Sequence, residues 1–288
     1  MPSEAIPFSL SPNLAKVCIG LIDVVRSNPN GDPARQGSPK VDPWGHGRVS
    51  HGKLRRMCRD YALEFYKVDL AVHPDVPMDD MYAQFETTKS LLAAKWDSRV
   101  FGDAAPGKKF KSKATGTFGL NAAMSIDPVS IEQGDLTRCT GYKKAKGNDE
   151  DDDEIGASMG SSPFVEYGLY RTNSPIHAIN AKRNGTTEED LLIAVEALLY
   201  GWDYDRAANR PHVDLRRLFL FEYPSHRFLP GAASVNRWVQ VVKRPGVFDP
   251  SSFEDYDITV DTSQMSPGMV LHEWADGRWI DQARMAAK

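Results

Sequence analysis

The chain has 288 residues, of which 41% are hydrophobic and 26% are charged, and its formal net charge at pH 7 is -4. This composition is typical of a globular protein with a sizeable core, and the slight excess of acid argues against a simple basic nucleic-acid binder. Three cysteines without a CxxC pair argue against a disulfide framework or a zinc knuckle. Because no apolar run approaches the roughly 20 residues of a membrane helix, we expect a cytoplasmic protein with no membrane partner. We also expect no cofactor and no metal.

The charged residues are unevenly distributed along the chain. Basic residues gather in the segments 40–59, 99–113 and 138–146, whereas the segment 148–154 is a run of acidic residues. Local basic patches on a nearly neutral protein can still follow a chain of phosphates. The net charge therefore leaves a nucleic-acid partner open.

A strand and a helix flank a long loop near the start of the chain. Residues 16–25 are almost continuously apolar, which predicts a central strand. A helix is predicted over 51–66, with Ser50 as its N-cap and one apolar stripe that consists of Leu54, Met57, Cys58, Tyr61 and Phe65.

The loop between this strand and this helix is rich in turn residues. Asn28, Asn30, Gly31 and Asp32 stand among prolines, which cannot continue a helix or a central strand. A loop of this length inside a compact domain is usually functional or disordered, and its turn chemistry favours the first. We predict that these four residues shape the loop.

The rest of the chain predicts further helices and strands. In chain order we expect a helix over 82–95, a half-buried strand over 115–126, a strand over 164–180, a helix over 187–204 that opens with a capping box at Thr187, and strands over 215–223 and 237–243. Two segments of the tail, 256–260 and 269–274, are expected to pair as a terminal hairpin.

These elements predict an α+β fold. The core order is β-α-β-β-α-β, which is the ferredoxin-like pattern and also the layout of the RNA-recognition module, whose open sheet face binds single strands. We predict one domain over 1–288, with insertions at about 67–114 and 140–162 and a C-terminal extension at about 244–288.

The helix predicted over 51–66 carries the first candidate binding cluster. Its polar side contains Lys53, Arg55, Arg56 and Arg59, and its N-terminus presents free N–H groups that suit a phosphate. The alternative interpretation is a solvated helix face, which is the commoner fate of such a cluster.

A second candidate cluster combines cations with aromatic rings. Charge for a nucleic-acid backbone and aromatic faces for its bases are what a single-strand groove requires. The alternative is a pair of core phenylalanines beside a solubilising lysine loop, and Phe118 fits the core well. The cluster consists of Arg99, Phe101, Lys108, Lys109, Lys111, Lys113 and Phe118.

The segment 140–162 contains too little apolar surface to form a core of its own. It interrupts two predicted strands, so it can extend as a hairpin arm, and the alternative is a plain linker. Lys143, Lys144 and Lys146 at its near end suit a phosphate backbone.

A catalytic site is the less favoured interpretation. Asp32, Asp42, His46 and His51 lie close together in the sequence, but their spacing matches no zinc signature, and we interpret them as turn residues. The chain has no phosphate-binding loop, nucleophile elbow or dinucleotide fingerprint.

Six short motifs occur in an order that resembles the backbone subunit of type I CRISPR Cascade, especially subtype I-C. Each motif is weak alone, but their order over roughly residues 16–243 is specific. They are Asn28-Pro29-Asn30-Gly31-Asp32-Pro33, Val41-Asp42-Pro43-Trp44-Gly45-His46-Gly47, Asp97-Ser98-Arg99-Val100-Phe101-Gly102, Ser125-Ile126-Asp127-Pro128-Val129, Val165-Glu166-Tyr167-Gly168-Leu169-Tyr170-Arg171 and Asp203-Tyr204-Asp205-Arg206-Ala207-Ala208.

The resemblance implies a hand-shaped core of the RAMP type, of which many copies polymerise along one CRISPR RNA. It implies that a thumb-like hairpin at 140–162 kinks the guide, that base pairing reads the DNA target, and that other Cascade subunits complete the complex. It further implies a non-catalytic scaffold whose cations, with Arg171 in one of the shared motifs, contact the guide.

Two other functions remain open at this point. Type III relatives cleave RNA with a metal-dependent aspartate in the loop after the first strand, and Asp32 occupies a comparable loop. A ferredoxin-like domain that binds a small molecule is the third reading, and it lacks any pocket motif.

Overall fold

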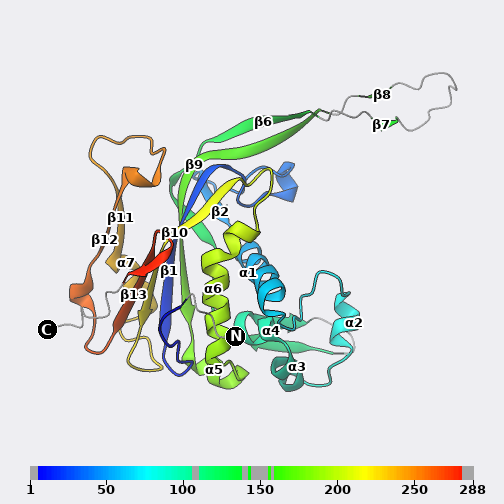
Figure 1. The fold of residues 1–288 in the computed structure, drawn as a ribbon, viewed down its shortest axis with the longest axis vertical. Helices are drawn as coiled ribbons and strands as arrows, with labels where there is room; N and C mark the ends of the chain where they lie inside the picture. Colours follow the sequence, from blue (N-terminus) through cyan, green and yellow to red (C-terminus); the bar gives the residue numbers. More distant parts are fainter. Residues whose placement is uncertain (1–5, 106–109, 138–141, 144–154, 157–158, 281–288) are drawn as a thin grey trace.

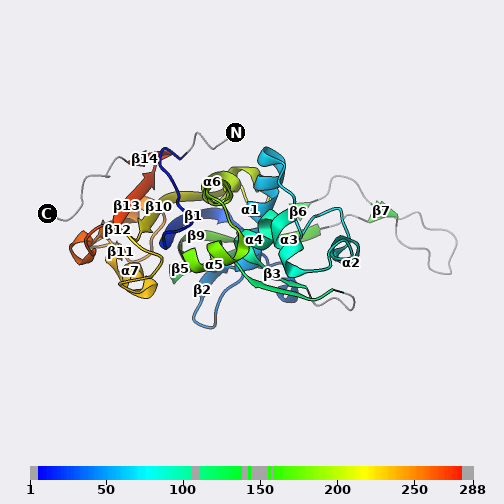
Figure 2. The ribbon, with the colours of Figure 1, turned by 90° about the horizontal axis from the view of Figure 1, so that it is seen from below.

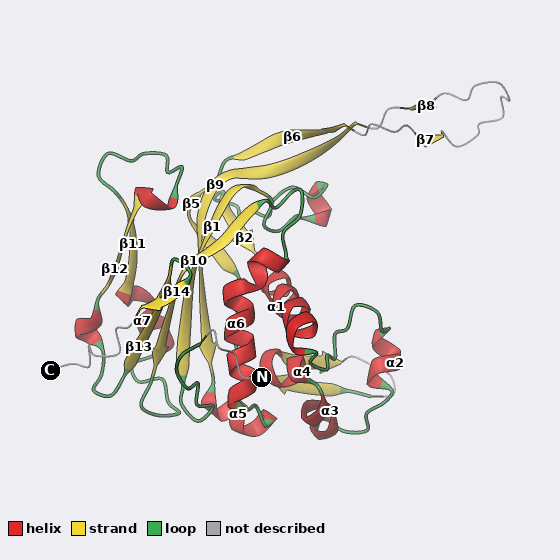
Figure 3. Cartoon of the chain, in the orientation of Figure 1, coloured by secondary structure: helices red, strands yellow, loops and turns green. Residues whose placement is uncertain are grey.

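The structure is a computed structural model, and it describes residues 6–105, 110–137, 142–143, 155–156 and 159–280. A large antiparallel sheet is the centre of a mixed α/β fold (Figure 1). Two long helices lie on one side of this sheet, and a small hairpin and a short helix lie on the other side (Figure 3). Within the described residues, no helix is both long and apolar enough to cross a membrane.

Within the described residues, the main sheet has eight strands. Seven follow the spatial order β14-β13-β10-β1-β9-β5-β2, and β6 pairs with β9 outside this path. Their bounds are β1 Lys16–Ser27, β2 His46–Val49, β5 Ala123–Pro128, β6 Ile131–Thr137, β9 Met159–Ile176, β10 His212–Glu222, β13 Val270–Ala275 and β14 Arg278–Ile280. The strands predicted over 16–25 and 215–223 are confirmed as β1 and β10. The strand predicted over 164–180 is confirmed as β9 only as far as Ile176, because helix α5 (Ala178–Asn184) begins two residues later.

Strand β1 lies at the centre of the sheet because its residues are apolar on both faces. Cys18, Ile22 and Val24 belong to one core cluster, whereas alternate residues such as Val17 and Ile19 belong to the other. β9 and β10 flank β1, and all these pairs are antiparallel.

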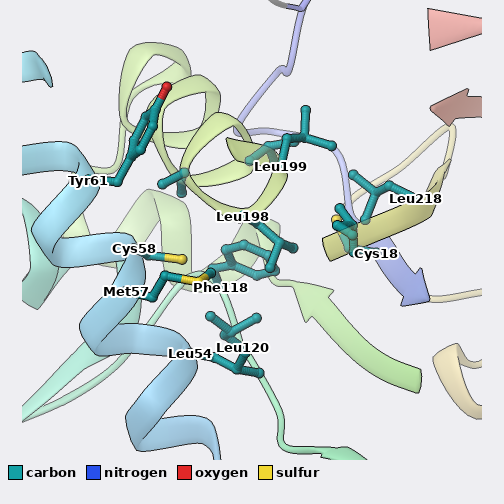
Figure 4. Packing of buried hydrophobic residues seen from close by; sticks show 14 of the residues in the cluster. Cys18, Leu54, Met57, Cys58, Tyr61, Phe118, Leu120, Leu198, Leu199 and Leu218 are labelled. Carbon is teal, nitrogen blue, oxygen red and sulfur yellow. The ribbon is translucent and has the colours of Figure 1, made fainter. Parts of the chain in front are cut away.

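Helices α1 (His51–Tyr66) and α6 (Glu188–Tyr204) cover one face of the sheet. In Figure 4, Met57 and Cys58 of α1 lie beside Leu198 of α6 and Phe118. The helix predicted over 51–66 is confirmed together with its N-cap, since the Ser50 hydroxyl accepts a hydrogen bond from the Lys53 amide.

The predicted capping box of α6 is also confirmed. The Thr187 hydroxyl accepts from the Asp190 amide, and the Asp190 carboxylate accepts from the Thr187 amide. One detail of the α1 stripe was wrong. Phe65 is 58% exposed and packs on the surface against Tyr61 and Tyr204.

The second face of the sheet is covered by α7 (Ala232–Trp238), β11 (Val239–Lys243) and β12 (Tyr256–Val260), with two short 3-10 turns at Phe253–Asp255 and Thr262–Gln264. Val17, Ile19 and Leu21 of β1 pack into this second core. The open sheet face of an RNA-recognition module is therefore covered here.

The predicted terminal hairpin was wrong. β12 pairs with β11 instead of with the segment 269–274, and β13 pairs with β10 and β14. β1 pairs with one edge of β10, and β13 pairs with the other edge. The strand predicted over 237–243 also begins two residues later, because Arg237 and Trp238 complete α7.

The inserted segment after α1 forms a small lobe at the opposite end of the molecule from β11 and β12 (Figures 1 and 2). It contains α2 (Met78–Tyr82), α3 (Thr88–Ala94), α4 (Trp96–Phe101), β3 (Gly102–Ala105) and β4 (Ser112–Thr115). The single helix predicted over 82–95 was wrong, because Thr87 and Ser90 form a capping box that starts a new helix.

The strand predicted over 115–126 exists only in part. β5 begins at Ala123. The preceding segment lies against β9 through an isolated bridge between Phe118 and Ile176 and through irregular hydrogen bonds, such as the one from the Gly119 amide to the Pro175 carbonyl oxygen at 2.8 Å. The predicted alternation holds at Phe118 and Leu120, which are fully buried, but it was wrong for β5, where Ala123 and Ser125 are buried instead of residues 122, 124 and 126.

β6 and the first part of β9 form a long hairpin that projects from the sheet (Figure 1). Their register runs from Ile131 opposite Val165 to Thr137 opposite Met159. Two short strands farther out, β7 (Tyr142–Lys143) and β8 (Ile155–Gly156), pair with each other. Most of the predicted thumb segment 140–162 lies outside the described residues.

Candidate nucleic-acid interface

The loop between β1 and β2 is held by its asparagines. The Asn28 side-chain amide donates to the carbonyl oxygens of Gly37 (2.7 Å) and Pro163 (3.1 Å), so it joins both sides of the loop to β9. The Asn30 side-chain oxygen accepts from the Ser50 amide at 2.8 Å. Because Ser50 is the N-cap of α1, the loop sets the position of that helix end.

Gly31 and Asp32 allow the loop to turn back on itself. A Cβ atom on Gly31 would lie 2.8 Å from the Gly37 carbonyl oxygen, so no other residue fits this close approach. Asp32 accepts a hydrogen bond from the Ala34 amide (3.1 Å) and caps a short 3-10 turn at Pro33–Arg35. The Asp32 carboxylate therefore has a structural task in this loop.

A second turn follows, and Asp42 organises it. One Asp42 oxygen accepts from the amides of Trp44 and His46, both at 2.9 Å, and the His46 ring contacts the Ser125 carbonyl oxygen at 3.0 Å. These contacts agree with the interpretation of Asp42 and His46 as turn residues. Among the described residues, no group of three or more His, Cys, Asp or Glu side chains could hold a metal ion.

Three of the four predicted cations on α1 form ion pairs. They are Lys53 with Asp205, Arg56 with Asp60 at 2.8 Å, and Arg59 with Asp97 at 2.7 Å. Arg56 is the most exposed of the three, and its pair joins two residues one helical turn apart. The binding role predicted for these residues stays a prediction, but each charge already has a partner within the chain.

The Arg59–Asp97 pair is part of the interior. The Asp97 side chain is 1% exposed and also accepts hydrogen bonds from the amides of Ala71 (2.7 Å) and Val72 (3.1 Å). This carboxylate ties the connection after α1 to α4. Removal of the Arg59 charge would leave a buried carboxylate without its cation.

Arg99 and Arg171 also make structural contacts. Arg99 forms a two-pronged ion pair with Asp190, with Nε and Nη2 at 2.9 and 2.8 Å from the two carboxylate oxygens. Arg171 donates from Nη1 to the Val239 carbonyl at 2.8 Å and from Nη2 to the Asn236 carbonyl. Arg99 thus joins α4 to the start of α6, and Arg171 joins β9 to α7 and β11.

The two phenylalanines of the second cluster lie in the core. Phe101 is 4% exposed, Phe118 is fully buried, and their ring centroids are 6.4 Å apart. Trp96 packs edge-on against Phe101 at 5.4 Å. In this structure neither face of these rings is open to a nucleic-acid base, which favours the core interpretation of this pair.

Of the predicted lysines that lie outside α1, three are among the described residues and four, including Lys146, are not. Lys111 and Lys113 are exposed, next to and within β4. Lys143 lies in β7, whereas Lys108, Lys109 and Lys144 lie outside the described residues.

A group of loop cations was missing from the predicted site. Arg35, Lys40 and Arg48 form no ion pair within the described part of the chain, and Arg35 and Arg48 are exposed. The Arg48 amide donates to the Lys40 carbonyl (2.7 Å), so these two residues are neighbours at the base of the loop. Lys40 and Arg48 lie in the base-rich segment 40–59, but the prediction selected only the cations of the helix within that segment.

Arg55 differs from the other cations of α1. It has no ion pair or hydrogen-bond partner among the described residues, and its Nε atom is shielded from water. Burial lowers the pKa of the Arg55 guanidinium, and the positive charge of Arg59 lowers it further. Arg55 lines a pocket of about 350 Å³ together with Phe101, Asp103 and His177.

The sequence of residues 16–261 matches the model of one protein family, described as CRISPR-associated protein Cas7. The chain belongs to the Cas7 family. The match includes the shaped loop, α1, the projecting hairpin and the β11–β12 pair. No curated protein sequence matches the chain.

The solved structures that are similar to this chain share little of its sequence. Two are described as "CRISPR RNA-guided surveillance complex, pre-nicking" and "CRISPR RNA-guided surveillance complex". They are 13% and 14% identical to this chain, with TM-scores of 0.48 and 0.45, and cover 72% of it in each case and 78% and 68% of their own chains. A third, "Cryo-EM structure of the Type III-B Cmr-beta bound to cognate target RNA", is 8% identical with a TM-score of 0.40 and covers 72% of this chain and 61% of its own.

Proposed function

We propose that this chain is a non-catalytic scaffold subunit that polymerises along CRISPR RNA and presents the guide for pairing with target DNA. The observation that carries the proposal is the Cas7 family match over residues 16–261. We further propose subtype I-C, assembly with the other Cascade subunits in the cytoplasm, and a ferredoxin-like core formed by β1, α1, β5, β9, α6 and β10.

The loop and sheet-edge cations are the best candidates to hold the guide backbone. Lys40, Arg48, Lys111 and Lys113 have no ion pairs in the described chain, so no internal pair has to break when they meet phosphate. The β6–β9 hairpin, which projects from the sheet, is the proposed stem of the thumb.

The proposal of a scaffold without catalytic activity is supported by the contacts of Asp32. Its carboxylate accepts from the Ala34 amide and caps a turn, as a structural loop residue does. The assembled complex should therefore leave bound RNA intact in magnesium or manganese. Regularly spaced RNA fragments that disappear with EDTA and with Asp32→Ala would overturn this part of the proposal.

Charge reversal of the unpaired cations tests the scaffold role. The variant Lys40→Glu/Arg48→Glu should copurify with at least tenfold less guide RNA, and Lys111→Glu/Lys113→Glu should behave alike. The matched control is Arg227→Glu/Arg278→Glu, which makes the same charge change at two exposed positions elsewhere. The salt dependence of RNA binding should flatten by about 0.7 in log-log slope per lost phosphate contact.

Arg59 is left intact in this test because its reversal would place two carboxylates together in the interior. Circular dichroism spectra would check that each variant is folded. Normal RNA-dependent assembly by both folded charge-reversal variants would refute the assigned surface.

A further inference from the structure

The turn that leads into β2 carries an exposed tryptophan at its tip. The Trp44 side chain is 78% exposed, and its ring contacts no other aromatic ring and no cation among the described residues. The other five of the six tryptophans in the chain are buried or half-buried. Tryptophan is a highly buried residue type on average, and the scaffold role as described above uses only the cations near Trp44.

The backbone below the Trp44 ring is fixed by the turn. One Asp42 carboxylate oxygen accepts from the amides of Trp44 and His46, and the Asp42 amide donates to the His46 carbonyl, all at 2.9 Å. Gly45 completes the turn at a φ of 87°, and its carbonyl oxygen accepts from the Val129 amide at 3.0 Å. A ligand that packs on this ring therefore has little chain entropy to remove.

Two cations lie side by side at the base of the same turn. Val41 pairs with Gly47, and the Arg48 amide donates to the Lys40 carbonyl oxygen at 2.7 Å, so Lys40 and Arg48 lie opposite each other in an antiparallel ribbon. Side chains at opposite positions point to the same face, and like charges there are destabilising. Neither side chain has an ion pair within the described chain. A negatively charged ligand on this face would remove the repulsion.

The ring and the two cations are close enough to contact one strand. Lys40 and Arg48 each lie four residues from Trp44, so their Cα atoms are within about 13 Å of the Cα atom of Trp44. A phosphate alone would neutralise the cations but leave the ring in water. An apolar surface of a second copy would cover the ring but desolvate the two charges without a partner. A single-stranded nucleic acid supplies both a phosphate chain and flat bases.

We propose that Trp44 stacks on an unpaired base of a single-stranded nucleic acid whose phosphates contact Lys40 and Arg48. The inference rests on the proposed scaffold function and adds a stacking position to its phosphate contacts. Every base has a π-face, so this contact positions the strand without reading its sequence.

The first test measures binding of short single-stranded RNAs to the whole chain, by the fluorescence anisotropy of a labelled strand. Trp44→Ala should weaken binding roughly 5- to 100-fold, whereas Trp44→Phe keeps an aromatic face and should retain most of the affinity. The matched control is Phe248→Ala, which removes another exposed ring, between β11 and β12, and should not change binding. Wild-type affinity in Trp44→Ala would overturn the proposal.

A strand without bases separates stacking from every other contact. An abasic strand of the same length keeps the sugars and phosphates, so the wild-type chain and Trp44→Ala should bind it equally. Trp44→Ala should also leave the salt dependence of RNA binding unchanged, whereas Lys40→Glu/Arg48→Glu should lower it. If Trp44→Ala weakens binding of the abasic strand as much as binding of the complete strand, the ring does not stack on a base.

Tryptophan fluorescence gives a direct readout of the contact. Because Trp44 is the most exposed tryptophan, stacking on a base should quench part of the emission when RNA binds. The quench should be absent in Trp44→Phe, although that variant still binds. A quench of wild-type size in Trp44→Phe would come from another tryptophan and would contradict the proposal.

Two further outcomes separate this inference from the scaffold function on which it rests. If the chain binds both strands and Trp44→Ala changes neither affinity, the stacking role is wrong and the scaffold role stands. If the folded wild-type chain binds neither strand, both proposals are wrong. Sedimentation without RNA identifies the competing partner. Weaker self-association of Trp44→Ala with unchanged RNA binding would assign the ring to a contact between copies.

Discussion

The two faces of the sheet are covered in different ways. α1 and α6 seal the first face with fully buried apolar side chains such as Leu54 and Leu198, and their polar contacts, such as the Tyr61 hydroxyl on Glu196 at 3.0 Å, join the helices to each other and not to the sheet. On the second face, α7, β11 and β12 add polar ties to their apolar core, for example the Tyr256 hydroxyl on Asp127 at 2.8 Å. Apolar burial is insensitive to salt and pH, whereas polar ties respond to both.

This difference indicates which part of the molecule unfolds first. The second face is also held by Arg216, which joins the buried Asp23 (Nη1, 3.1 Å) to Glu254 in the covering segment (Nη2, 3.2 Å), and by Lys243, 3.1 Å from Asp127. Burial raises the pKa of Asp23, so keeping this carboxylate charged costs free energy in the folded state. We infer that the helix-covered face sets global stability and that the hairpin-covered face opens first.

Loss of a core ring on the first face should have the largest effect. Phe118→Ala is expected to lower the free energy of unfolding by about 4 kcal/mol, because a fully buried ring leaves a cavity. Chemical denaturation followed by circular dichroism measures this. The matched control is Phe248→Ala, since Phe248 is 85% exposed and its loss should change stability by less than about 0.5 kcal/mol. Similar losses in the two variants would refute the assigned core.

The second-largest effect is expected at the buried ion pair between Arg59 and Asp97. Asp97→Ala is expected to cost about 3 kcal/mol, because it leaves Arg59 without its partner and frees two backbone amides. Asp60→Ala removes the partner of Arg56 at the surface and should cost less than about 1 kcal/mol. Denaturation midpoints compare the two, and equal costs would show that the Arg59–Asp97 pair behaves as a surface pair.

The pH dependence of stability sharpens the comparison on the first face. His272 lies opposite Leu220 in the sheet, stacks on Phe8 at 3.6 Å, and has its pKa lowered to about 4, chiefly by burial. Between the unfolded value of about 6.5 and 4, acidification protonates the unfolded chain but not the folded one, so stability falls with falling pH. The full shift corresponds to about 3 kcal/mol, and because the ring is only partly buried, solvent screening should reduce the loss to about 2 kcal/mol.

His272→Phe should flatten that part of the pH profile, whereas His226→Gln, at an exposed position, should leave it unchanged. Urea denaturation between pH 4 and 7 gives the measurement. A profile of His272→Phe with the original slope would assign the acid sensitivity to other groups.

Local signals explain what the sequence predicted well. The caps at Ser50 and Thr187 and the apolar stripes of α1 and α6 lie within a few residues of each other, so they can be recognised without a fold. The pairing of β12 with β11 could not be recognised in this way. Both neighbours of β12 in the chain are plausible partners, and the free edge of β10 decides between them.

The candidate site shows the same limit. The sequence identified most of the cations but not their partners, because Asp97 lies 38 residues from Arg59 and Asp190 lies 91 residues from Arg99. Which charges are free depends on distant carboxylates that only the fold brings near. The lack of an ion pair for Arg55 within the described residues is visible, for the same reason, only in three dimensions.

The smallest expected effect tests whether the second face opens by itself. Arg171→Met keeps most of the side-chain length but removes the hydrogen bonds to the carbonyls of Val239 and Asn236. The change should cost about 1–2 kcal/mol, and amide hydrogen exchange should accelerate in α7 and β11 while β1 stays protected. Arg244→Met, at an exposed position after β11, should change neither. If Arg171→Met instead accelerates exchange in β1 as much as in α7, the two faces unfold as one unit, since local opening of the hairpin-covered face would leave the central strand paired with β9 and β10.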